Sequence, residues 1–408
     1  MCVTHSTRTF SARHFYNMNI NSTFDLYSTS LFIPFASTLR PHYKAHSILF
    51  SWYSLCSAVI GVIVWQSWYN HKGNSLVPAP FIGSRFAWLA RLDYFVNAKH
   101  VIDTGYAQCR ESIFKICGND VIVLPNKYVD ELRNIPNNKL NAILALVKNA
   151  EGAFALTDVL ATSNLHTQVI QTRLTPKLGA LVPSVRYELD IALDAEFPRC
   201  DKTGVYLEIY HVLHQIVGRA SARVFVGPDL CRNKAWLETA EGYTNNVFVT
   251  IVALRLLPFW AKPIVHCCLP SSWKIYYHWW RARRQLLPLI AQRQLNKDKG
   301  RKQKGEGLSN FLQMLMDEAG NGPDSDPVTI AKRVLSLTLA SNHTTTMALV
   351  EAIYDLCAYP EYIEELRDEV QQAVSQDGGW HKTTLTKMRK LDSFMKESQR
   401  VNPPSYSK

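Results

Sequence analysis

The stretch Asp326–Pro360, DPVTIAKRVLSLTLASNHTTTMALVEAIYDLCAYP, predicts one long helix at the centre of the fold. Asp326 is a good N-cap, Pro327 suits the first helical position, and Pro360 ends the segment. The 32 residues between the two prolines would form a helix about 48 Å long. Apolar residues occupy both halves, and a helix that is apolar around much of its circumference belongs inside a large domain.

Polar residues interrupt this helix at its middle, in the segment Ala340-Ser341-Asn342-His343-Thr344-Thr345-Thr346. Burying such groups costs several kcal/mol unless each of them is hydrogen-bonded. One interpretation is structural: each hydroxyl bonds to the carbonyl oxygen four residues before it, and the segment only bends the helix. The other interpretation is that the segment belongs to a chemical site.

A second motif, Glu397-Ser398-Gln399-Arg400, ends the helix-like segment that begins at Lys390, and Val401-Asn402-Pro403-Pro404 follows it. Residues three apart share one helix face, so Glu397 and Arg400 are expected to form an ion pair. Between the two motifs, Pro360–Val370 predicts an amphipathic helix rich in acidic residues.

The rest of the body, from Trp88 to Asp317, is mostly helical in its hydrophobic period. Ile113–Cys117 and Val121–Leu124 flank Gly118-Asn119-Asp120 and predict a β-hairpin. Residues 243–280 hold nine Phe, Trp and Tyr side chains at positions 243, 248, 259, 260, 273, 276, 277, 279 and 280, and we expect most of them in the core.

Taken in this order, the segments resemble the cytochrome P-450 haem-thiolate monooxygenases over residues 75–408, most densely from residue 310 onward. The resemblance implies a mainly α fold with small β-sheets, namely the P-450 fold without its carboxy-terminal part and with an amino-terminal transmembrane helix. It implies haem as cofactor, electrons from NADPH through an NADPH-cytochrome reductase, and a hydrophobic small-molecule substrate. Within the family, residues 308–400 most resemble fungal enzymes of secondary metabolism that oxidise terpenoids and indole diterpenes.

The resemblance also assigns roles within the polar segment. Thr344, with Thr345 beside it, takes the position of the hydroxyl that serves oxygen activation and relays protons. His343 stands where the family has an acidic relay residue, and Ser341 stands where it has glycine. Ala340 and Ser341 are expected where the helix passes over the haem. An ordinary imidazole has a pKa of about 6.5, so proton delivery through His343 should depend on pH near neutrality.

Four further residues receive roles from the resemblance. Glu397 and Arg400 take the place of the ion pair that supports the haem core. His166 and Arg173 lie where the family has donors to the haem propionates, although the family's Trp is absent from this stretch. An ordinary role at the surface or in a helix cap is the alternative for His166 and Arg173. No residue is assigned as a metal ligand.

The haem thiolate of the family comes from a downstream Phe-x-x-Gly-x-x-x-Cys-x-Gly segment, which these 408 residues do not contain. None of the nine cysteines lies in a glycine-rich loop, and Cys357 follows Thr344 by roughly 20 Å along the helix axis. We therefore expect a truncated monooxygenase, from a shortened gene, a damaged gene or a misread exon boundary. The alternative is a catalytically inactive remnant, a membrane-anchored helical protein that at most binds apolar ligands.

The amino-terminal part predicts a membrane anchor, because no Asp, Glu, Lys or Arg lies between Lys44 and Lys72. Ile48–Tyr69 would span roughly 33 Å, enough for a bilayer core, with aromatic residues near both ends. A buried helix of the soluble domain is the alternative. We predict four parts: a disordered tail (1–47), a transmembrane anchor (48–69), a proline-containing hinge (70–87) and a truncated catalytic domain (88–408).

Composition and charge fit this assignment. The apolar fraction is 47%, the charged fraction is 19% and the formal net charge is +11. No zinc spacing or RNA-binding motif accompanies the charge, so a nucleic-acid partner is not expected. An anionic membrane or an acidic redox partner explains the charge instead. By the resemblance, we expect a single-pass protein of the endoplasmic reticulum whose catalytic domain faces the cytosol and contacts membrane lipid.

Overall fold

The computed structural model describes Gly61 and residues 79–84, 87–116, 121–198, 204–299, 310–320 and 322–403. The chain divides into two compact units, residues 1–72 with 200–205, and residues 73–199 with 206–408. All the elements described below belong to the second unit. The predicted tail lies outside the described residues, as does the predicted anchor apart from Gly61. No described helix is both long enough and apolar enough to cross a membrane.

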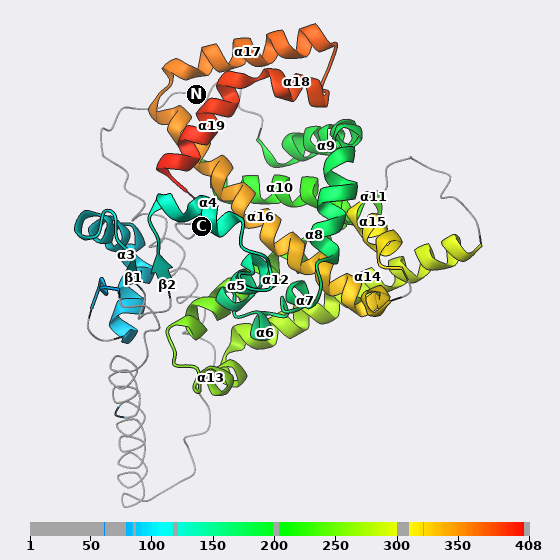
Figure 1. Ribbon diagram of the computed structural model, residues 1–408. Coiled ribbons are helices and arrows are strands. Elements are labelled where there is room, and N and C mark those ends of the chain that lie inside the picture. The colour runs from blue at the N-terminus through cyan, green and yellow to red at the C-terminus, as the bar shows by residue number, and fades with distance from the viewer. Residues whose placement is uncertain are drawn as a thin grey trace, which may run out of the picture. The chain divides into compact units, whose positions relative to one another are not determined.

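The second unit is mainly helical, as the sequence predicts (Figure 1). Its α-helices are α3 (Ala87–Gln108), α4 (Val129–Arg133), α5 (Ala142–Asn149), α6 (Gly152–Ala155), α7 (Val159–Thr162), α8 (Leu165–Val169), α9 (Thr175–Glu196), α10 (Ile209–Phe225), α11 (Pro228–Cys231), α12 (Lys234–Arg255), α13 (Lys262–Cys268), α14 (Pro270–Asp298), α15 (Phe311–Glu318), α16 (Pro327–Ala358), α17 (Glu361–Asp377), α18 (Lys382–Lys387) and α19 (Arg389–Val401). The described residues also form the 3-10 helices η1 (Asn126–Tyr128) and η3 (Pro323–Ser325) and the π-helix η2 (Ile170–Leu174).

The described part of the chain has one small sheet, which confirms the predicted hairpin. Strand β1 (Phe114–Ile116) pairs antiparallel with β2 (Val121–Val123), with Phe114 opposite Val123. A piece of the predicted hinge joins this sheet, because the Ile82 amide donates to the Lys115 carbonyl at 2.9 Å. Ile82, Phe114 and Ile116 then form a separate small core with Val101 of α3.

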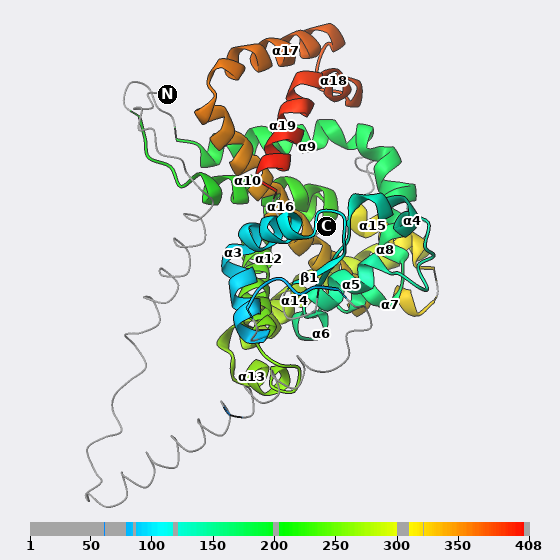
Figure 2. The ribbon, with the colours of Figure 1, turned by 60° about the vertical axis from the view of Figure 1, so that its left-hand side comes forward.

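The long helix α16 confirms the prediction from residues 326–360 at both ends. The Asp326 carboxylate accepts hydrogen bonds from the Thr329 amide at 2.9 Å and from the Thr329 hydroxyl at 2.8 Å. The helix ends at Ala358, two residues before Pro360. Both views show α16 running through the middle of the helical unit (Figures 1 and 2).

The main core forms where α16 packs against α10, α12 and α14. Tight packing there is expected to supply most of the stability, because burying one large apolar side chain contributes about 1.5–3 kcal/mol. The largest fully buried side chains of this core include Trp236 and Tyr243 from α12, Ile275, Leu286 and Ile290 from α14, and Phe311, Leu312 and Leu315 from α15.

The prediction that most aromatic residues of 243–280 lie in the core is wrong. Six of the nine are exposed, and Phe259 keeps 85% of its surface open to solvent. Four of the six lie on the outer side of α14, whose inner side presents Ile275, Ala282 and Leu286 to the core together with the half-buried Trp279. The other two lie on α12 and in the loop before α13. The exposed aromatic side chains are Phe248, Phe259, Trp273, Tyr276, Tyr277 and Trp280.

Helices α17, α18 and α19 lie together at one end of α16 (Figure 1). The Glu369 carboxylate of α17 accepts hydrogen bonds from the backbone amides of Lys390 and Leu391 at 2.8 and 2.9 Å. These amides belong to the first turn of α19, where no intrahelical acceptor exists and negative charge is favourable. The predicted acid-rich helix is thus confirmed as α17, and one of its acidic side chains holds α19.

Candidate functional site

The polar segment of α16 divides its side chains between an open face and a buried face. Ala340 and Thr344 lie one turn apart, and both are exposed. Asn342 and Thr346 also lie one turn apart, and both are buried among the neighbouring helices. His343 is half-buried between these two faces. Small side chains therefore leave one side of the central helix accessible at its midpoint.

Hydroxyl groups of the segment bond back to the helix, as the structural interpretation predicts. The Thr344 hydroxyl donates to the Ala340 carbonyl at 2.9 Å, and the Thr346 hydroxyl donates to the Asn342 carbonyl at 2.8 Å. A hydroxyl that donates one hydrogen bond still accepts others through its lone pairs. Thr344 therefore remains able to accept a hydrogen bond on the open face. Thr345 is also exposed.

Ser341 does not share the open face with Ala340 and Thr344. Its hydroxyl hydrogen-bonds to the Ser221 hydroxyl of α10 at 3.2 Å. The side chain that replaces the expected glycine therefore joins α16 to α10. Of the five predicted residues in this segment, the structure leaves Ala340, Thr344 and Thr345 accessible and turns Ser341 and His343 towards other helices.

His343 lies in an aromatic pocket formed by α10 and α12. Its Nδ1 is 2.6 Å from the Tyr210 hydroxyl, and its ring meets Phe248 edge-on at 4.7 Å between centroids. The ring of His214 lies 5.1 Å away. The Nε2 atom is buried and has no hydrogen-bond partner among the described residues.

The Tyr210 contact fixes which nitrogen of His343 carries the proton. Burial, followed by the charge of Glu241, raises the pKa of Tyr210 to about 12, so this phenol is protonated and donates. Nδ1 of His343 then accepts the hydrogen bond, and the proton of the neutral ring belongs to Nε2. The structure thus favours a neutral imidazole whose N–H is buried.

Burial, and then the neighbouring His214, lowers the pKa of His343 to about 4. His343 is therefore neutral at pH 7, and the predicted titration near neutrality is corrected to a titration near pH 4. The difference arises because the sequence does not reveal burial of the ring. The pKa of His214 is also lowered, mainly by burial, while Glu241 opposes that shift.

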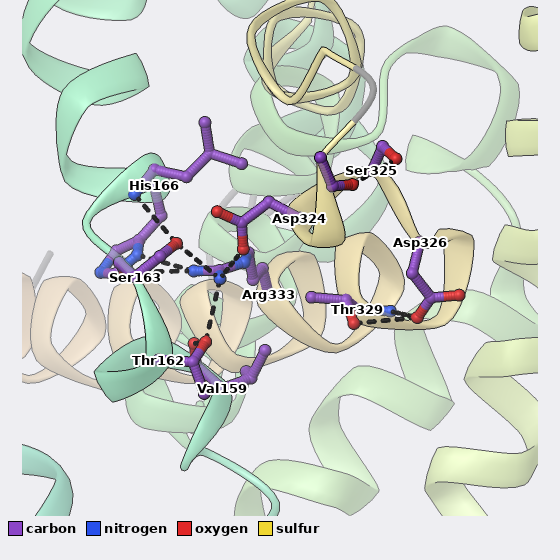
Figure 3. A network of polar contacts seen from close by, with 11 residues as sticks. Val159, Thr162, Ser163, His166, Asp324, Ser325, Asp326, Thr329 and Arg333 are labelled. Atoms are coloured by element: carbon purple, nitrogen blue, oxygen red, sulfur yellow. Dashed lines mark hydrogen bonds and ion pairs between the residues drawn. The ribbon is translucent and has the colours of Figure 1, made fainter.

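A buried polar network anchors the amino-terminal half of α16 (Figure 3). Arg333 is fully buried, and its guanidinium donates to the Asp324 carboxylate at 2.7 Å and to the Ser163 hydroxyl at 2.8 Å. It also reaches the Thr162 hydroxyl at 3.1 Å and His166 Nδ1 at 3.2 Å. One cation therefore joins α16 to α7, to the start of α8 and to η3. Sequence analysis missed Arg333, although a basic residue inside an apolar helix segment is an available signal.

The two predicted propionate donors lie in different networks. His166 is buried beside Arg333, and burial followed by that positive charge lowers its pKa to about 4. Arg173 forms an ion pair with Glu318 at 2.9 Å and keeps half of its side chain exposed. The structure does not bring the two residues together, and their contact with haem remains a prediction.

The Glu397–Arg400 ion pair forms as predicted within α19. Arg400 contacts the carboxylate through two nitrogens, Nε at 2.8 Å and a terminal nitrogen at 2.6 Å. Both side chains are largely exposed, and α19 packs against α16. Ser398 between them is buried, and its hydroxyl has no partner among the described residues.

A single protein-family model covers all of these segments. The family model described as Cytochrome P450 matches residues 126–408. This region contains the polar segment of α16, the acid-rich α17 and the Glu397–Arg400 pair.

Curated fungal proteins match over most of the chain. The Cytochrome P450 monooxygenase AN1598 of Emericella nidulans is 46% identical over 333 residues, which are 80% of this chain and 62% of that protein. The Ent-kaurene oxidase P450-4 of Gibberella fujikuroi is 37% identical over 86% of this chain and 67% of its own length. The Cytochrome P450 monooxygenase AtmP of Aspergillus flavus is 38% identical over 88% and 67%, respectively. The chain thus spans about two thirds of the length of these relatives.

A solved structure supports the fold. The retinoic acid-bound cyanobacterial protein CYP120A1 superposes with a TM-score of 0.55 at 20% identity, over 80% of this chain and 70% of that chain. At this identity the likeness concerns the arrangement of the helices alone.

Proposed function

Because this chain belongs to the cytochrome P450 family, we propose that it is a haem-dependent monooxygenase that oxidises a hydrophobic small molecule. The observation that carries the proposal is the open face of α16, where Ala340 and Thr344 leave the midpoint of the central helix accessible. The Thr344 hydroxyl on that face can both donate and accept a hydrogen bond. Proton transfer by a positioned hydroxyl is a common element of catalysis.

The residues present fit one side of a haem. Ala340 and Thr344 offer small side chains along an accessible helix face, which a flat macrocycle can approach closely. Among the described cysteines, Cys231 is unsuitable as a thiolate, because burial and then Glu188 raise its pKa to about 11. No group of three or more His, Cys, Asp or Glu in the described part of the chain is placed to hold a metal ion. Bound haem would supply the redox chemistry of oxygen activation.

Residues of this chain would hold and transfer the protons. Thr344 would hold a proton at Oγ1 on the open face, with the Ala340 carbonyl as its resting acceptor. His343, which we propose as the relay residue, stays neutral near pH 7 and carries its proton at Nε2. The Tyr210 hydroxyl would keep the ring in this tautomer, and Phe248 would exclude water from its edge. Thr345 is the alternative hydroxyl on the exposed side.

The names of the relatives support a proposal for the substrate class. One relative is named an ent-kaurene oxidase, and ent-kaurene is a hydrocarbon, so we propose a terpenoid or indole-diterpene-like secondary metabolite as substrate. An apolar substrate needs an apolar pocket with few polar groups. Glu397 and Arg400 would support the core of that site, and His166 and Arg173 remain candidates for its haem propionates.

The partners we propose are an NADPH-cytochrome reductase and membrane lipid, at the cytosolic side of the endoplasmic reticulum. The support lies on α14 and on the loop before α13, where Trp273, Trp280 and Phe259 are exposed. The surrounding stretch from residue 242 to 297 contains seven Arg and Lys residues besides the buried Arg293, and no Asp or Glu. Exposed aromatic side chains among cations suit an anionic bilayer surface. The proposed anchor at Ile48–Tyr69 would hold this surface near the lipid.

The test of the proposed relay replaces single hydroxyls on α16. The assay uses a chain extended with the carboxy-terminal segment of the Emericella nidulans relative, because the 408 residues lack the thiolate motif. Thr344→Ala should lower the ratio of product formed to oxygen consumed and leave the haem content near that of the parent. Thr338→Ala, which removes a buried back-bonded hydroxyl, is the matched control. If Thr344→Ala and the control gave the same ratio of product formed to oxygen consumed, the relay role would belong to another residue.

A further inference from the structure

A small cavity lies between α10, α12 and α16, apart from the open face of Thr344. The space open to a water-sized molecule is about 10 Å³, which is the volume that holds one water. Nine residues from the three helices line it: His214, Gln215, Gly218, Trp236, Leu237, Ala240, Glu241, Thr338 and Asn342.

Two of the residues that line this cavity each carry a buried polar atom without a partner in the described part of the chain. The indole Nε1–H of Trp236 is a donor on a side chain with no exposed surface. The Oδ1 of Asn342 is an acceptor on a side chain that is 3% exposed. Neither atom makes a hydrogen bond to any described residue. Leaving a buried polar group unpaired costs about 1–3 kcal/mol, so two such groups on residues that line one space point to a shared partner.

The remaining polar residues around the cavity agree with such a partner. The Thr338 hydroxyl donates to the Val334 carbonyl at 2.9 Å and keeps its acceptor lone pairs. The Gln215 amide donates to the Glu241 carboxylate at 3.1 Å, and both of these residues line the cavity. Cavities that stay dry are lined by apolar side chains, and this one is not.

We propose that the cavity binds one structural water molecule, which accepts a hydrogen bond from Trp236 Nε1 and donates one to Asn342 Oδ1. A water molecule satisfies both atoms at once, because it donates and accepts. A larger polar ligand does not fit the volume. The water would join α12 to α16 at Asn342, the residue directly before His343. This inference does not rest on the proposed function, and its tests measure hydration and stability.

The first test fills the cavity with a methyl group. Gly218 lines the cavity, and a Cβ added there would meet the Asn342 side-chain nitrogen at 3.8 Å, an ordinary contact, so we expect Gly218→Ala to displace the water without a clash. Gly179→Ala in α9 is the matched control, since its Cβ would meet only the Lys382 side chain, at 3.4 Å and beyond. Both changes gain helix propensity, and only the first strands two polar atoms.

We expect Gly179→Ala to raise the urea midpoint of unfolding slightly and Gly218→Ala to lower it. The expected difference is roughly tenfold or more in the unfolding equilibrium constant, because stranding even one of the two buried polar groups has an effect of this size. A dry cavity predicts the opposite, because the added methyl group would fill empty space and stabilise the fold. Gly218→Ala as stable as Gly179→Ala, or more stable, would overturn the proposal.

The second test observes the water directly. In protein labelled with ¹⁵N-tryptophan, the Trp236 indole N–H should show a magnetisation-transfer peak to a long-lived water, and Trp236→Phe identifies the signal. Gly218→Ala should remove this peak, whereas Gly179→Ala should keep it. Absence of the peak in the parent protein would overturn the proposal. So would a peak that persists unchanged in Gly218→Ala.

Discussion

Replacing Arg333 by methionine should destabilise the fold more than any loss of a surface ion pair. Arg333 is fully buried, and it donates to the Asp324 carboxylate and to hydroxyls of Thr162 and Ser163 (Figure 3). Methionine keeps much of the packing volume but supplies no donor. The variant therefore isolates the polar contribution of this side chain.

The expected loss in the free energy of unfolding depends on the partners that Arg333→Met leaves unpaired. Removing one partner of a fully buried ion pair costs about 3–5 kcal/mol. The Asp324 side chain is 30% exposed, so water can replace part of the lost contact. We therefore expect a loss near the lower end of that range, about 3 kcal/mol. Removing the charge of Asp324 as well, in Arg333→Met/Asp324→Asn, should cost less than the sum of the two single changes.

Urea unfolding, followed by circular dichroism and by tryptophan fluorescence, measures the free energy of unfolding. The control is Arg367→Met, which breaks an exposed ion pair with Glu364 on α17 and should cost no more than about 1 kcal/mol. The account of Arg333 is refuted if Arg333→Met behaves like Arg367→Met. Strict additivity in the double variant would equally contradict a direct interaction with Asp324.

Two further predictions concern acid stability and the membrane. His166 and His343 have a pKa of about 4 in the folded state and of about 6.5 when unfolded, so the unfolded chain binds more protons between these values. The free energy of unfolding should therefore fall as the pH falls from about 6.5 to 4, by up to about 1.4 kcal/mol per pH unit for each ring. A free energy of unfolding that stays constant over this pH range would contradict the neutral rings. Deleting residues 1–72 should move much of the protein to the soluble fraction, and release of the full chain from membranes by high salt or alkali would exclude the anchor at Ile48–Tyr69.

Local signals explain what could be predicted from the sequence. The bounds of α16 follow from Asp326, Pro327 and Pro360, because caps and prolines act on their own neighbours. The Glu397–Arg400 pair follows from helix geometry alone. The β-hairpin likewise depends on residues 113–124, which are adjacent in the chain.

Long-range features could not be predicted in this way. The Arg333 network joins residues up to 171 positions apart, and no local pattern specifies such a contact. The pKa of His343 depends on burial against α10 and α12, which the sequence does not state. The aromatic residues of α14 were misplaced because hydrophobicity alone does not decide which side of a helix faces the core. Trp273 and Trp280 lie on the outer side.

The most direct test of the central claim is the carbon-monoxide difference spectrum of the reduced protein. It is measured on the 408-residue chain and on the same chain extended with the carboxy-terminal segment of the Emericella nidulans relative. We predict the red-shifted band of thiolate-ligated haem from the extended chain, because the sulfur donates electron density to iron. We predict no such band from the 408 residues alone, since none of their nine cysteines lies in the ligand motif. A folded extended chain without the band would contradict haem binding by this fold. A thiolate band from the unextended chain would show that one of the nine cysteines ligates iron after all.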